Sequence, residues 1–415
     1  MPPPQSRRVV IVGAGHAGGT AAALLRQYGW AGEVVLLGEE PTPPYQRPPL
    51  SKAFLKREAD AESLKLKDDA FYAEHAIDLR TGVRVEAIDA GARQVVLGSG
   101  EVIAYDILIL ATGSVARVLP IPGADLEGVL ALRSLADAEA IGASLGPGRR
   151  LAVVGAGYVG LEVAASARSL GAEVTVIERE ARVLARVAAE PLSRFFEAYH
   201  RARGVEVLTS AEAHAFEDDG GGRVSALVLS DGRRIACDVA VVGVGAAACD
   251  ALAASAALRC EGGIVVDETA LSSDPAIYAI GDVTARPMPL YGARRFRLES
   301  VPNALEQAKQ AAAAITGHPP PPPEVPWFWS DQYDLKLQIA GVPFDSDRLV
   351  LRGDMEAGRF ALFHLAPDGC LLCVEACNAP AEFMAGRQMI GRRARPDPER
   401  LADPTVSMKQ VAEAA

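Results

Sequence analysis

The chain has 415 residues, of which 49% are hydrophobic, and it carries a formal net charge of −11. This length allows two or three domains with large cores, and the acidic balance argues against nucleic-acid binding. No apolar stretch approaches the roughly 20 residues of a membrane span, and no signal peptide opens the sequence. The six cysteines are too sparse for a secreted disulfide scaffold. We therefore expect a cytoplasmic protein without a membrane partner.

The first motif is a glycine-rich turn between an apolar run and a stretch of small residues. Residues 9–12 predict a buried strand, and residues 17–25 predict a helix. A second apolar strand, residues 33–37, leads to Glu39, about 20 residues after the last glycine, where an acid holds a ribose hydroxyl. A bare glycine motif would suit any glycine-rich turn, but this whole arrangement predicts a dinucleotide site. The G-x-G-x-x-G glycines are Gly13, Gly15 and Gly18.

A proline-rich segment, residues 41–52, follows and cannot form a helix or a central strand. We interpret it as a stiff loop that presents Arg47 and Lys52 beside a bound cofactor, although a rigid connection alone would also explain the prolines. We expect a helix over residues 52–57 with Ser51 as its N-cap. Residues 77–102 alternate and predict antiparallel strands.

The opening pattern occurs a second time. Residues 150–154 predict a strand, residues 161–170 predict a helix, and Glu178 ends the strand that comes next. Two fingerprints predict two dinucleotides. A carboxylate at Glu178 suits a free 2′-hydroxyl and favours NADH over NADPH, whereas the neighbouring Arg179 is able to accept a 2′-phosphate. The glycines of this second motif are Gly155, Gly157 and Gly160.

Three further apolar runs predict buried strands that end in small-residue turns. They cover residues 105–110, 237–242 and 277–280. An aspartate at the carboxyl end of such a strand, here Asp282, lies in the crevice where ligands bind. After a predicted helix at residues 303–315 and a proline linker, the remaining chain predicts strands 336–340, 348–351, 359–365 and 370–376 and a helix 382–390.

Taken together, these motifs resemble the glutathione-reductase-like flavoproteins that bind two dinucleotides. Residues 47–52, 298–304 and 327–333 are similar to those of the NADH-dependent ferredoxin reductases of bacterial oxygenase systems. The resemblance implies an α/β fold with two Rossmann-like domains and a C-terminal α+β domain. The expected boundaries are 1–120 with 247–323 for FAD, 121–246 for NAD and 324–415 for the C-terminal domain.

The resemblance also implies the site residues. Lys52 would stabilise the reduced flavin and Glu162 would keep that lysine charged and oriented; without the resemblance, Lys52 would be interpreted as a solvated lysine. Residues expected at FAD are Gly13, Gly15, His16, Ala17, Gly18, Glu39, Arg47, Lys52, Val83, Ala111, Thr112, Gly113, Arg133, Gly281, Asp282, Ser300, Val301 and Trp329. Residues expected at NADH are Gly155, Gly157, Tyr158, Gly160 and Glu178, and the other expected cofactor-binding residues of this part are Val159, Glu162, Val244 and Gly245.

The positions of the cysteines limit the chemistry. Disulfide reductases of this superfamily carry a redox-active cysteine pair soon after the first acidic residue, whereas the first cysteine here is Cys237. Electrons would therefore leave the flavin directly. Cys370, Cys373 and Cys377 lie on an apolar strand without a fourth ligand, so we interpret them as buried packing and expect no metal site.

The leading hypothesis is an NADH:ferredoxin oxidoreductase whose partner is a [2Fe-2S] ferredoxin. The alternatives are an NADH-binding redox sensor of the apoptosis-inducing-factor type and a flavin-dependent NADH oxidase. An acidic chain needs a local basic patch to attract an acidic ferredoxin, and Arg294, Arg295 and Arg297 are the expected docking site. Scattered solvated charges are the alternative interpretation of these arginines. We expect a monomer or a weak dimer.

Overall fold

A computed structural model describes residues 7–292 and 294–415, and the chain divides into two compact units. Unit 1 comprises the described part of Met1–Gln46 together with Glu62–Val115 and Ala247–Pro326. Unit 2 comprises Arg47–Ala61, Ala116–Ala246 and Trp327–Ala415. The short strands β8 (Ser114–Ala116) and β17 (Ala246–Ala248) lie where the chain passes between the units. The division into three domains stays a prediction.

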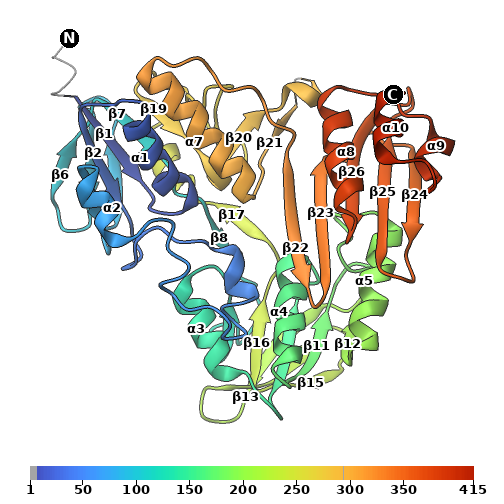
Figure 1. The fold of residues 1–415 in the computed structure, drawn as a ribbon. Helices are drawn as coiled ribbons and strands as arrows, with labels where there is room; N and C mark the ends of the chain where they lie inside the picture. Colours follow the sequence, from blue (N-terminus) through green and yellow to red (C-terminus); the bar gives the residue numbers. More distant parts are fainter. Residues whose placement is uncertain (1–6, 293) are drawn as a thin grey trace. The chain divides into compact units, whose positions relative to one another are not determined.

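Unit 1 is built on a parallel sheet with the strand order β19-β7-β1-β2-β3 (Figure 1). Successive side chains of a strand point to opposite faces, so Val9 and Ile11 pack with helices α1 and α7, whereas Val10 and Val12 enter a second core. The strands are β1 (Arg8–Val12), β2 (Glu33–Leu37), β3 (Ile77–Arg80), β7 (Ile107–Leu110) and β19 (Ile277–Ala279), and the helices are α1 (His16–Gln27) and α7 (Val301–Thr316).

The second core of unit 1 is covered by an antiparallel sheet with the order β4-β5-β6. The antiparallel prediction holds for β5 and β6, which pair as a hairpin on either side of Gly98 and Gly100. The antiparallel prediction is wrong for β3, which pairs in parallel with β2 at the sheet edge. An edge strand with one exposed face has the same alternating pattern as a hairpin strand, so the pattern alone does not separate them. The new strands are β4 (Val85–Asp89), β5 (Gln94–Leu97) and β6 (Val102–Ala104).

Smaller elements complete unit 1. A three-stranded sheet has the order β18-β20-β21, and short helices lie in the connections. These elements are α2 (Asp69–Glu74), α6 (Ala251–Ser255), β18 (Ile264–Val265), η3 (Gly281–Val283), β20 (Thr284–Pro287), η4 (Pro289–Tyr291) and β21 (Arg295–Phe296).

Unit 2 contains a second parallel sheet with the order β12-β11-β10-β16-β9. Residues 151–154 of β10 are buried, as is typical of an apolar run in a parallel sheet. A small antiparallel sheet, β13-β14-β15, packs against it. The elements are β9 (Val129–Ala131), α3 (Leu135–Ser144), β10 (Arg150–Val154), α4 (Tyr158–Ser169), β11 (Glu173–Ile177), α5 (Glu190–Ala202), β12 (Val205–Leu208), β13 (Ala213–Asp218), β14 (Val224–Leu229), β15 (Arg234–Ala236) and β16 (Val239–Val242).

The C-terminal part of unit 2 is an antiparallel sheet with the order β22-β23-β26-β25-β24. Helix α8 packs on β26 and β23, while Leu337, Phe360 and Leu362 belong to the same core as Phe196 of α5. This shared core explains why the C-terminal sheet and the second parallel sheet form one compact unit. The elements are β22 (Trp327–Gln332), β23 (Leu335–Gly341), β24 (Arg348–Asp354), β25 (Arg359–Leu365), β26 (Leu371–Cys377), α8 (Pro380–Gly391), α9 (Pro398–Ala402) and α10 (Met408–Glu413).

The helix predicted for residues 52–57 is wrong. The chain forms the single 3₁₀ turn η2 (Pro48–Ser51) and then continues in turns. Lys52 has φ −127° and ψ −107°, outside the helical region, and Arg57 has φ 63°. The hydroxyl of Ser51 does not cap a helix, because it donates to the carboxylate of Glu162.

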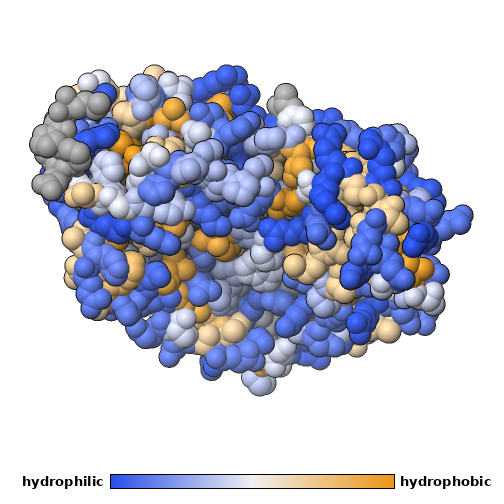
Figure 2. Space-filling model, turned by 45° about the horizontal axis from the view of Figure 1, so that its top comes forward, coloured by the Kyte–Doolittle hydropathy of each residue, from blue (hydrophilic) through white to orange (hydrophobic). Residues whose placement is uncertain are grey.

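Hydrophilic residues cover most of the face in Figure 2, and they interrupt its apolar areas. Within residues 7–292 and 294–415, the structure contains no helix with the length and apolar character that crossing a membrane requires.

Candidate functional site

The first fingerprint lies at the carboxyl edge of the parallel sheet in unit 1. Gly13 has φ 111°, and a Cβ atom there would lie 2.1 Å from the carbonyl oxygen of Ala111. A Cβ atom on Gly18 would lie 1.9 Å from the oxygen of Gly13, whereas one on Gly15 would meet no described atom within 4 Å. Two glycines are therefore required by the chain itself. The remaining glycine, Gly15, leaves open space at the start of α1, which fits the pyrophosphate of a dinucleotide.

The turn after β19 lies against the same helix. Gly281 has φ 81°, and a Cβ atom there would lie 3.0 Å from the Cβ of Ala17. Gln307 of α7 accepts hydrogen bonds from the Gly281 amide at 2.8 Å and from the Thr284 hydroxyl at 2.9 Å. Helix α7 thus holds the turn that carries Asp282 close to the first fingerprint.

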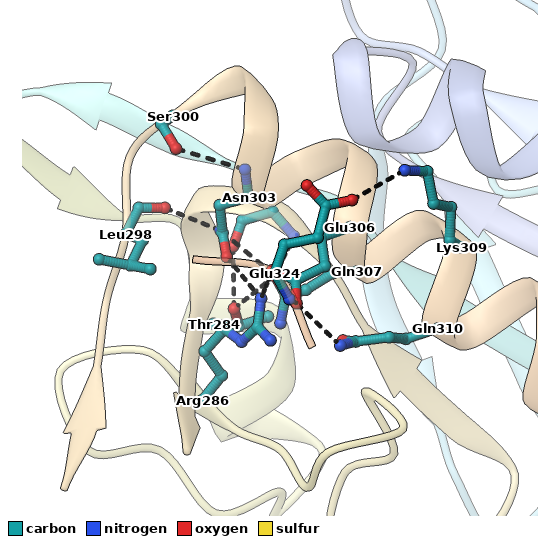
Figure 3. A network of polar contacts seen from close by, with 11 residues as sticks. Thr284, Arg286, Leu298, Ser300, Asn303, Glu306, Gln307, Lys309, Gln310 and Glu324 are labelled. Atoms are coloured by element: carbon teal, nitrogen blue, oxygen red, sulfur yellow. Dashed lines mark hydrogen bonds and ion pairs between the residues drawn. The ribbon is translucent and has the colours of Figure 1, made fainter. Parts of the chain in front are cut away.

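A buried polar network fixes the start of α7 (Figure 3). The Arg286 guanidinium pairs with Glu306 at 2.7 Å and donates to Asn303 at 3.0 Å, and all three side chains are buried. Ser300 caps the helix by accepting from the Asn303 amide. Ser300 and Val301, both predicted near the flavin, are therefore held by groups that are paired inside the unit.

The remaining predicted residues of unit 1 follow neighbouring strands. Thr112 donates to the carbonyl of Cys249 at 2.8 Å, which holds the turn after β7. The hydroxyl of Ser114 donates to the Asp282 carboxylate at 3.3 Å. Ala111 and Gly113 flank Thr112 in this turn. The structure therefore brings the turns after β7 and β19 together at one edge of the sheet.

Glu39 follows β2 and is the acidic residue that the sequence predicts to bind a ribose hydroxyl. Its carboxylate pairs with Arg84 at 2.6 Å, and each of the two side chains is 67% exposed. An ion pair this exposed contributes little stability. The Val83 amide donates to the Gly38 carbonyl at 2.7 Å, so Val83 also lies at the end of β2. His16 is the first residue of α1.

The second fingerprint repeats this geometry in unit 2. Gly155 has φ 103°, and a Cβ atom there would lie 2.5 Å from the oxygen of Gly243. A Cβ atom on Gly160 would lie 2.1 Å from the oxygen of Gly155, and one on Gly157 would meet no described atom within 4 Å. The open space again lies at a helix start, here that of α4, and fits a second dinucleotide. The predicted residues Val244 and Gly245 follow Gly243.

Glu178 lies beside the glycine turn of the second fingerprint. Its carboxylate accepts from the Ala156 amide at 2.7 Å and from the Glu180 amide at 2.9 Å. Arg179 pairs with Glu180 at 3.2 Å, and its side chain is 70% exposed. The predicted ribose acid is thus fixed by two backbone amides, while the neighbouring arginine has a partner of its own.

Tyr158 and Val159 form the first turn of α4. The Tyr158 hydroxyl donates to the Val187 carbonyl at 3.1 Å, and its ring packs edge-on against Phe328 at 4.9 Å. Burial raises the pKa of Tyr158, and Glu375 adds to that effect. Val159 is 47% exposed. The two neighbours therefore face different environments, one packed and one open.

The structure brings Lys52 and Glu162 together inside unit 2. The Lys52 ammonium lies 2.6 Å from Oε2 of Glu162, which is only 4% exposed. The ammonium also donates to the Pro48 carbonyl at 3.0 Å. The Ser51 hydroxyl donates to the same Oε2 at 2.6 Å, and the Ser330 hydroxyl donates to Oε1 at 2.7 Å. The carboxylate is therefore paired on both oxygens, and the catalytic role of the pair stays a prediction.

Behind Ser330 lies a row of buried polar groups that is not among the predicted site residues. Gln332 donates to Ser330 at 3.1 Å, and its oxygen lies 2.8 Å from Nε2 of His200. Burial lowers the pKa of His200; the Gln332 contact opposes this change and Arg203 adds to it. No local signal would have identified them, because Ser330, Asp331 and Gln332 are consecutive polar residues and only the structure shows that Ser330 and Gln332 are the buried ones.

Other residues predicted near the flavin are divided between the units. Arg47 donates to the Arg133 carbonyl at 2.7 Å, so these two lie together in unit 2. Trp329 packs beside Trp327, with ring centroids 5.6 Å apart. Because side chains alternate along β22, Trp329 and Ser330 point to opposite faces of the strand. Val301 belongs to unit 1.

The three clustered cysteines are buried in the C-terminal sheet. Cys373 and Cys377 lie on β26 and are fully buried, and Cys370 is 6% exposed. Burial raises the pKa of Cys373 well above its ordinary value and that of Cys377 to about 12. Cys373 and Cys377 therefore stay protonated, and all three side chains pack as small apolar groups.

Replacing Gly157 tests whether the open space at the second fingerprint holds NADH. Gly157 has φ −77° and ψ −179°, which any residue adopts, so we expect Gly157→Ala to keep the melting temperature and the flavin content. The added methyl group occupies the pyrophosphate space, so we expect the Kd for NADH to rise about tenfold in a binding titration. In the matched variant Gly160→Ala the Cβ meets a carbonyl at 2.1 Å, so the melting temperature falls. Unchanged NADH affinity in Gly157→Ala would contradict this assignment.

The buried imidazole of His200 makes stability depend on pH. Its folded-state pKa lies below the ordinary 6.5, so the unfolded chain takes up a proton first as pH falls. Its contribution is complete above about pH 6.5 and is lost as pH falls through the folded-state pKa. We expect His200→Gln to lose less unfolding free energy than the unmodified protein between about pH 7.5 and 5.5, measured by urea denaturation. Equal losses in both proteins would show that His200 does not titrate in this way.

Comparisons with known proteins agree with this architecture. The family model for pyridine nucleotide-disulphide oxidoreductases matches residues 7–308, and the model for the reductase C-terminal domain matches residues 327–412. The probable ferredoxin reductase CtmF of Castellaniella defragrans is 53% identical over 98% of this chain and 99% of its own. Putidaredoxin reductase CamA of Pseudomonas putida is 41% identical over 98% of this chain and 97% of its own.

A solved structure shows the same similarity in three dimensions. The crystal structure of the covalent putidaredoxin reductase–putidaredoxin complex matches with a TM-score of 0.95 and 40% identity, over 99% of each chain. The predicted α/β fold, with Rossmann-like units and a C-terminal antiparallel sheet, is therefore confirmed. The family match also implies binding of FAD and NAD(H), as predicted. The chain belongs to the pyridine nucleotide-disulphide oxidoreductase family and, within it, to the ferredoxin reductases.

Proposed function

We propose that this chain is an FAD-dependent NADH:ferredoxin oxidoreductase that supplies electrons to a [2Fe-2S] ferredoxin of a cytochrome monooxygenase or a ring-hydroxylating dioxygenase. The observation that carries the proposal is the buried pair of Lys52 and Glu162. The chain around it has two glycine fingerprints that fit dinucleotides and has no cysteine before Cys237. The names of the relatives, ferredoxin reductases with similarity over nearly their whole length, support the ferredoxin partner.

In this proposal the first fingerprint and Glu39 hold FAD, and the second fingerprint holds NADH. Bound FAD supplies the redox chemistry, by accepting a hydride from NADH and passing the electrons on singly. The Lys52 ammonium stabilises the negative charge that develops on the flavin ring. Glu162 orients the ammonium, and the hydroxyls of Ser51 and Ser330 supply the hydrogen bonds that a buried carboxylate requires.

The preference for NADH follows from Glu178. Its carboxylate is held by the Ala156 amide beside the glycine turn, where a free 2′-hydroxyl would donate to it and a 2′-phosphate would be repelled. Arg179 is the group that would favour the phosphate, and it is paired with Glu180. We therefore propose NADH as the electron donor.

Ferredoxin-dependent turnover tests the function. We expect NADH to reduce cytochrome c rapidly only when a [2Fe-2S] ferredoxin is added, with kcat/KM for NADH at least about tenfold above that for NADPH. The reason is that the flavin has no thiol to pass its electrons to and needs a one-electron carrier. Rapid oxygen consumption without ferredoxin would favour an NADH oxidase. Slow turnover in both assays, with an NADH-dependent change in oligomeric state, would favour a redox sensor.

The ferredoxin docking site tests a separate part of the proposal. Arg295 is partly exposed and lies 3.9 Å from Glu261, while Arg297 pairs with Glu299. In a chain of net charge −11, local arginines would focus attraction for an acidic partner. We expect the double variant Arg295→Glu with Arg297→Glu to lower the ferredoxin association rate about tenfold at low salt, and to leave flavin reduction by NADH unchanged.

The control makes the same change in net charge on unit 2. Arg348 and Arg359 are exposed on β24 and β25 of the C-terminal sheet, and replacing both with Glu should leave ferredoxin association close to that of the unmodified protein. Stopped-flow mixing at several ionic strengths measures the rates. Equal losses in the two double variants would mean that total charge, and not these arginines, governs the encounter.

A further inference from the structure

The two oxygens of the Glu162 carboxylate are held from different parts of the chain. Lys52 and Ser51 donate to Oε2, and Ser330 donates to Oε1. Ser330 is itself the first of three buried groups, with Gln332 and His200 behind it, and none of the three is more than 1% exposed. Burying polar groups costs free energy unless they are paired, so a continuous row of them requires a reason. We call Ser330, Gln332 and His200 the donor row.

Elementary hydrogen-bond chemistry fixes the direction of the donor row. An ionised carboxylate only accepts, so the Ser330 hydroxyl hydrogen points to Glu162 and its oxygen accepts from Nε2 of Gln332. The Gln332 amide oxygen therefore faces His200 at 2.8 Å, and His200 must carry its hydrogen on Nε2. Tyr333 lies 3.5 Å from Nδ1 of His200, which is too long for a strong bond. Every donor in the row thus points toward the carboxylate.

Regular secondary structure holds the donor row in place. Ser330 and Gln332 are two residues apart on β22 and share one face of the strand. Glu162 lies on α4, which packs against β22, and His200 lies on the last turn of α5. Because each member of the row lies in a strand or a helix, the Ser330 hydroxyl that donates to Oε1 of Glu162 is held in a fixed position.

The donor row is not suited to carry protons. Its central member is a primary amide, which passes a proton on only by becoming an imidic acid. His200 is buried and its pKa is lowered, so it stays neutral at neutral pH. What such a row does well is to orient and stabilise a charge, because aligned hydrogen bonds polarise one another in a buried environment.

We propose that Ser330, Gln332 and His200 are positioning residues that hold the Glu162 carboxylate, and through it the Lys52 ammonium, in the geometry that flavin reduction requires. The inference rests on the proposed function and extends it to residues outside the predicted cofactor contacts. Removing the donor row leaves both members of the pair in place but frees Oε1. The carboxylate then rotates, and the ammonium loses its fixed direction.

Flavin reduction tests the role of Ser330. Ser330→Ala removes one oxygen atom, and we expect the rate constant at saturating NADH to fall about tenfold in anaerobic stopped flow, the effect of losing a hydrogen bond to a charged group. The Kd for NADH should stay within about twofold, because only the transition state loses an interaction. Ser330→Thr keeps the hydroxyl and should restore most of the rate. The control Ser193→Ala removes another fully buried hydroxyl, one on α5 that contacts Arg182, and should react normally.

The state of His200 gives a readout that does not depend on activity. We expect ¹⁵N NMR of the flavin-containing protein to show the hydrogen of His200 on Nε2, and Gln332→Leu to abolish that preference. If Gln332→Leu does not fold, Ser330→Ala with its Thr and Ser193 controls decides the question alone.

The outcomes separate this inference from the proposed function. Failure of NADH to reduce the flavin of the unmodified protein would refute both. Normal reduction in the unmodified protein and an equal rate in Ser330→Ala would refute the donor row and leave the function standing. Equal slowing by Ser193→Ala would reduce the effect to general stability and would also overturn the inference. Hydrogen on Nδ1 of His200 would contradict the deduced direction.

Discussion

The buried carboxylate of Glu162 is the constraint that organises unit 2. A charge that is only 4% exposed is costly unless it is paired and hydrogen-bonded, and its partners come from segments far apart in the sequence. Lys52 and Ser51 reach it from one segment and Ser330 from another. This explains why residues 47–61 belong to unit 2 although the chain before and after them belongs to unit 1. Removing either set of partners would leave one oxygen of a buried carboxylate without a donor.

The two fingerprints show how one local pattern serves both fold and ligand. In each, the first glycine packs against a carbonyl just after a neighbouring strand, that of Ala111 or Gly243. The third glycine lets the helix pack against the carbonyl of the first glycine. These two requirements are internal to the chain. The middle glycines, Gly15 and Gly157, are not required by packing, since a Cβ there meets no described atom within 4 Å. Only the middle position therefore reports on a ligand.

Much of the fold is predictable because its signals are local. The apolar runs of β1 and β10, the glycine turns after them and the bounds of β25 follow from neighbouring residues. The predicted helix over residues 52–57 fails because Lys52 is committed to a carboxylate 110 positions away. Sequence periodicity carries no information about such a partner.

The same reasoning applies to the candidate site. Its glycines and strand-end acids are visible in the sequence because one strand, the next helix and the following strand set their spacing. The donor row is not visible, because His200 and Gln332 meet across 132 positions and Ser330 and Glu162 across 168. The resemblance supplied Lys52 and Glu162, but the groups that hold them follow only from the tertiary structure.

The two strand-end acids differ in a way that suits their expected nucleotides. Glu178 is held by two backbone amides, and a carboxylate has about four lone-pair sites, so it keeps acceptor capacity in a fixed place. Glu39 is exposed and contacts the side chain of Arg84, a flexible partner. A site fixed in advance loses less entropy each time a ligand binds. NADH would bind and leave in every turnover, so the lower entropy cost at Glu178 would apply each time. FAD would stay bound, so Glu39 would become ordered only once.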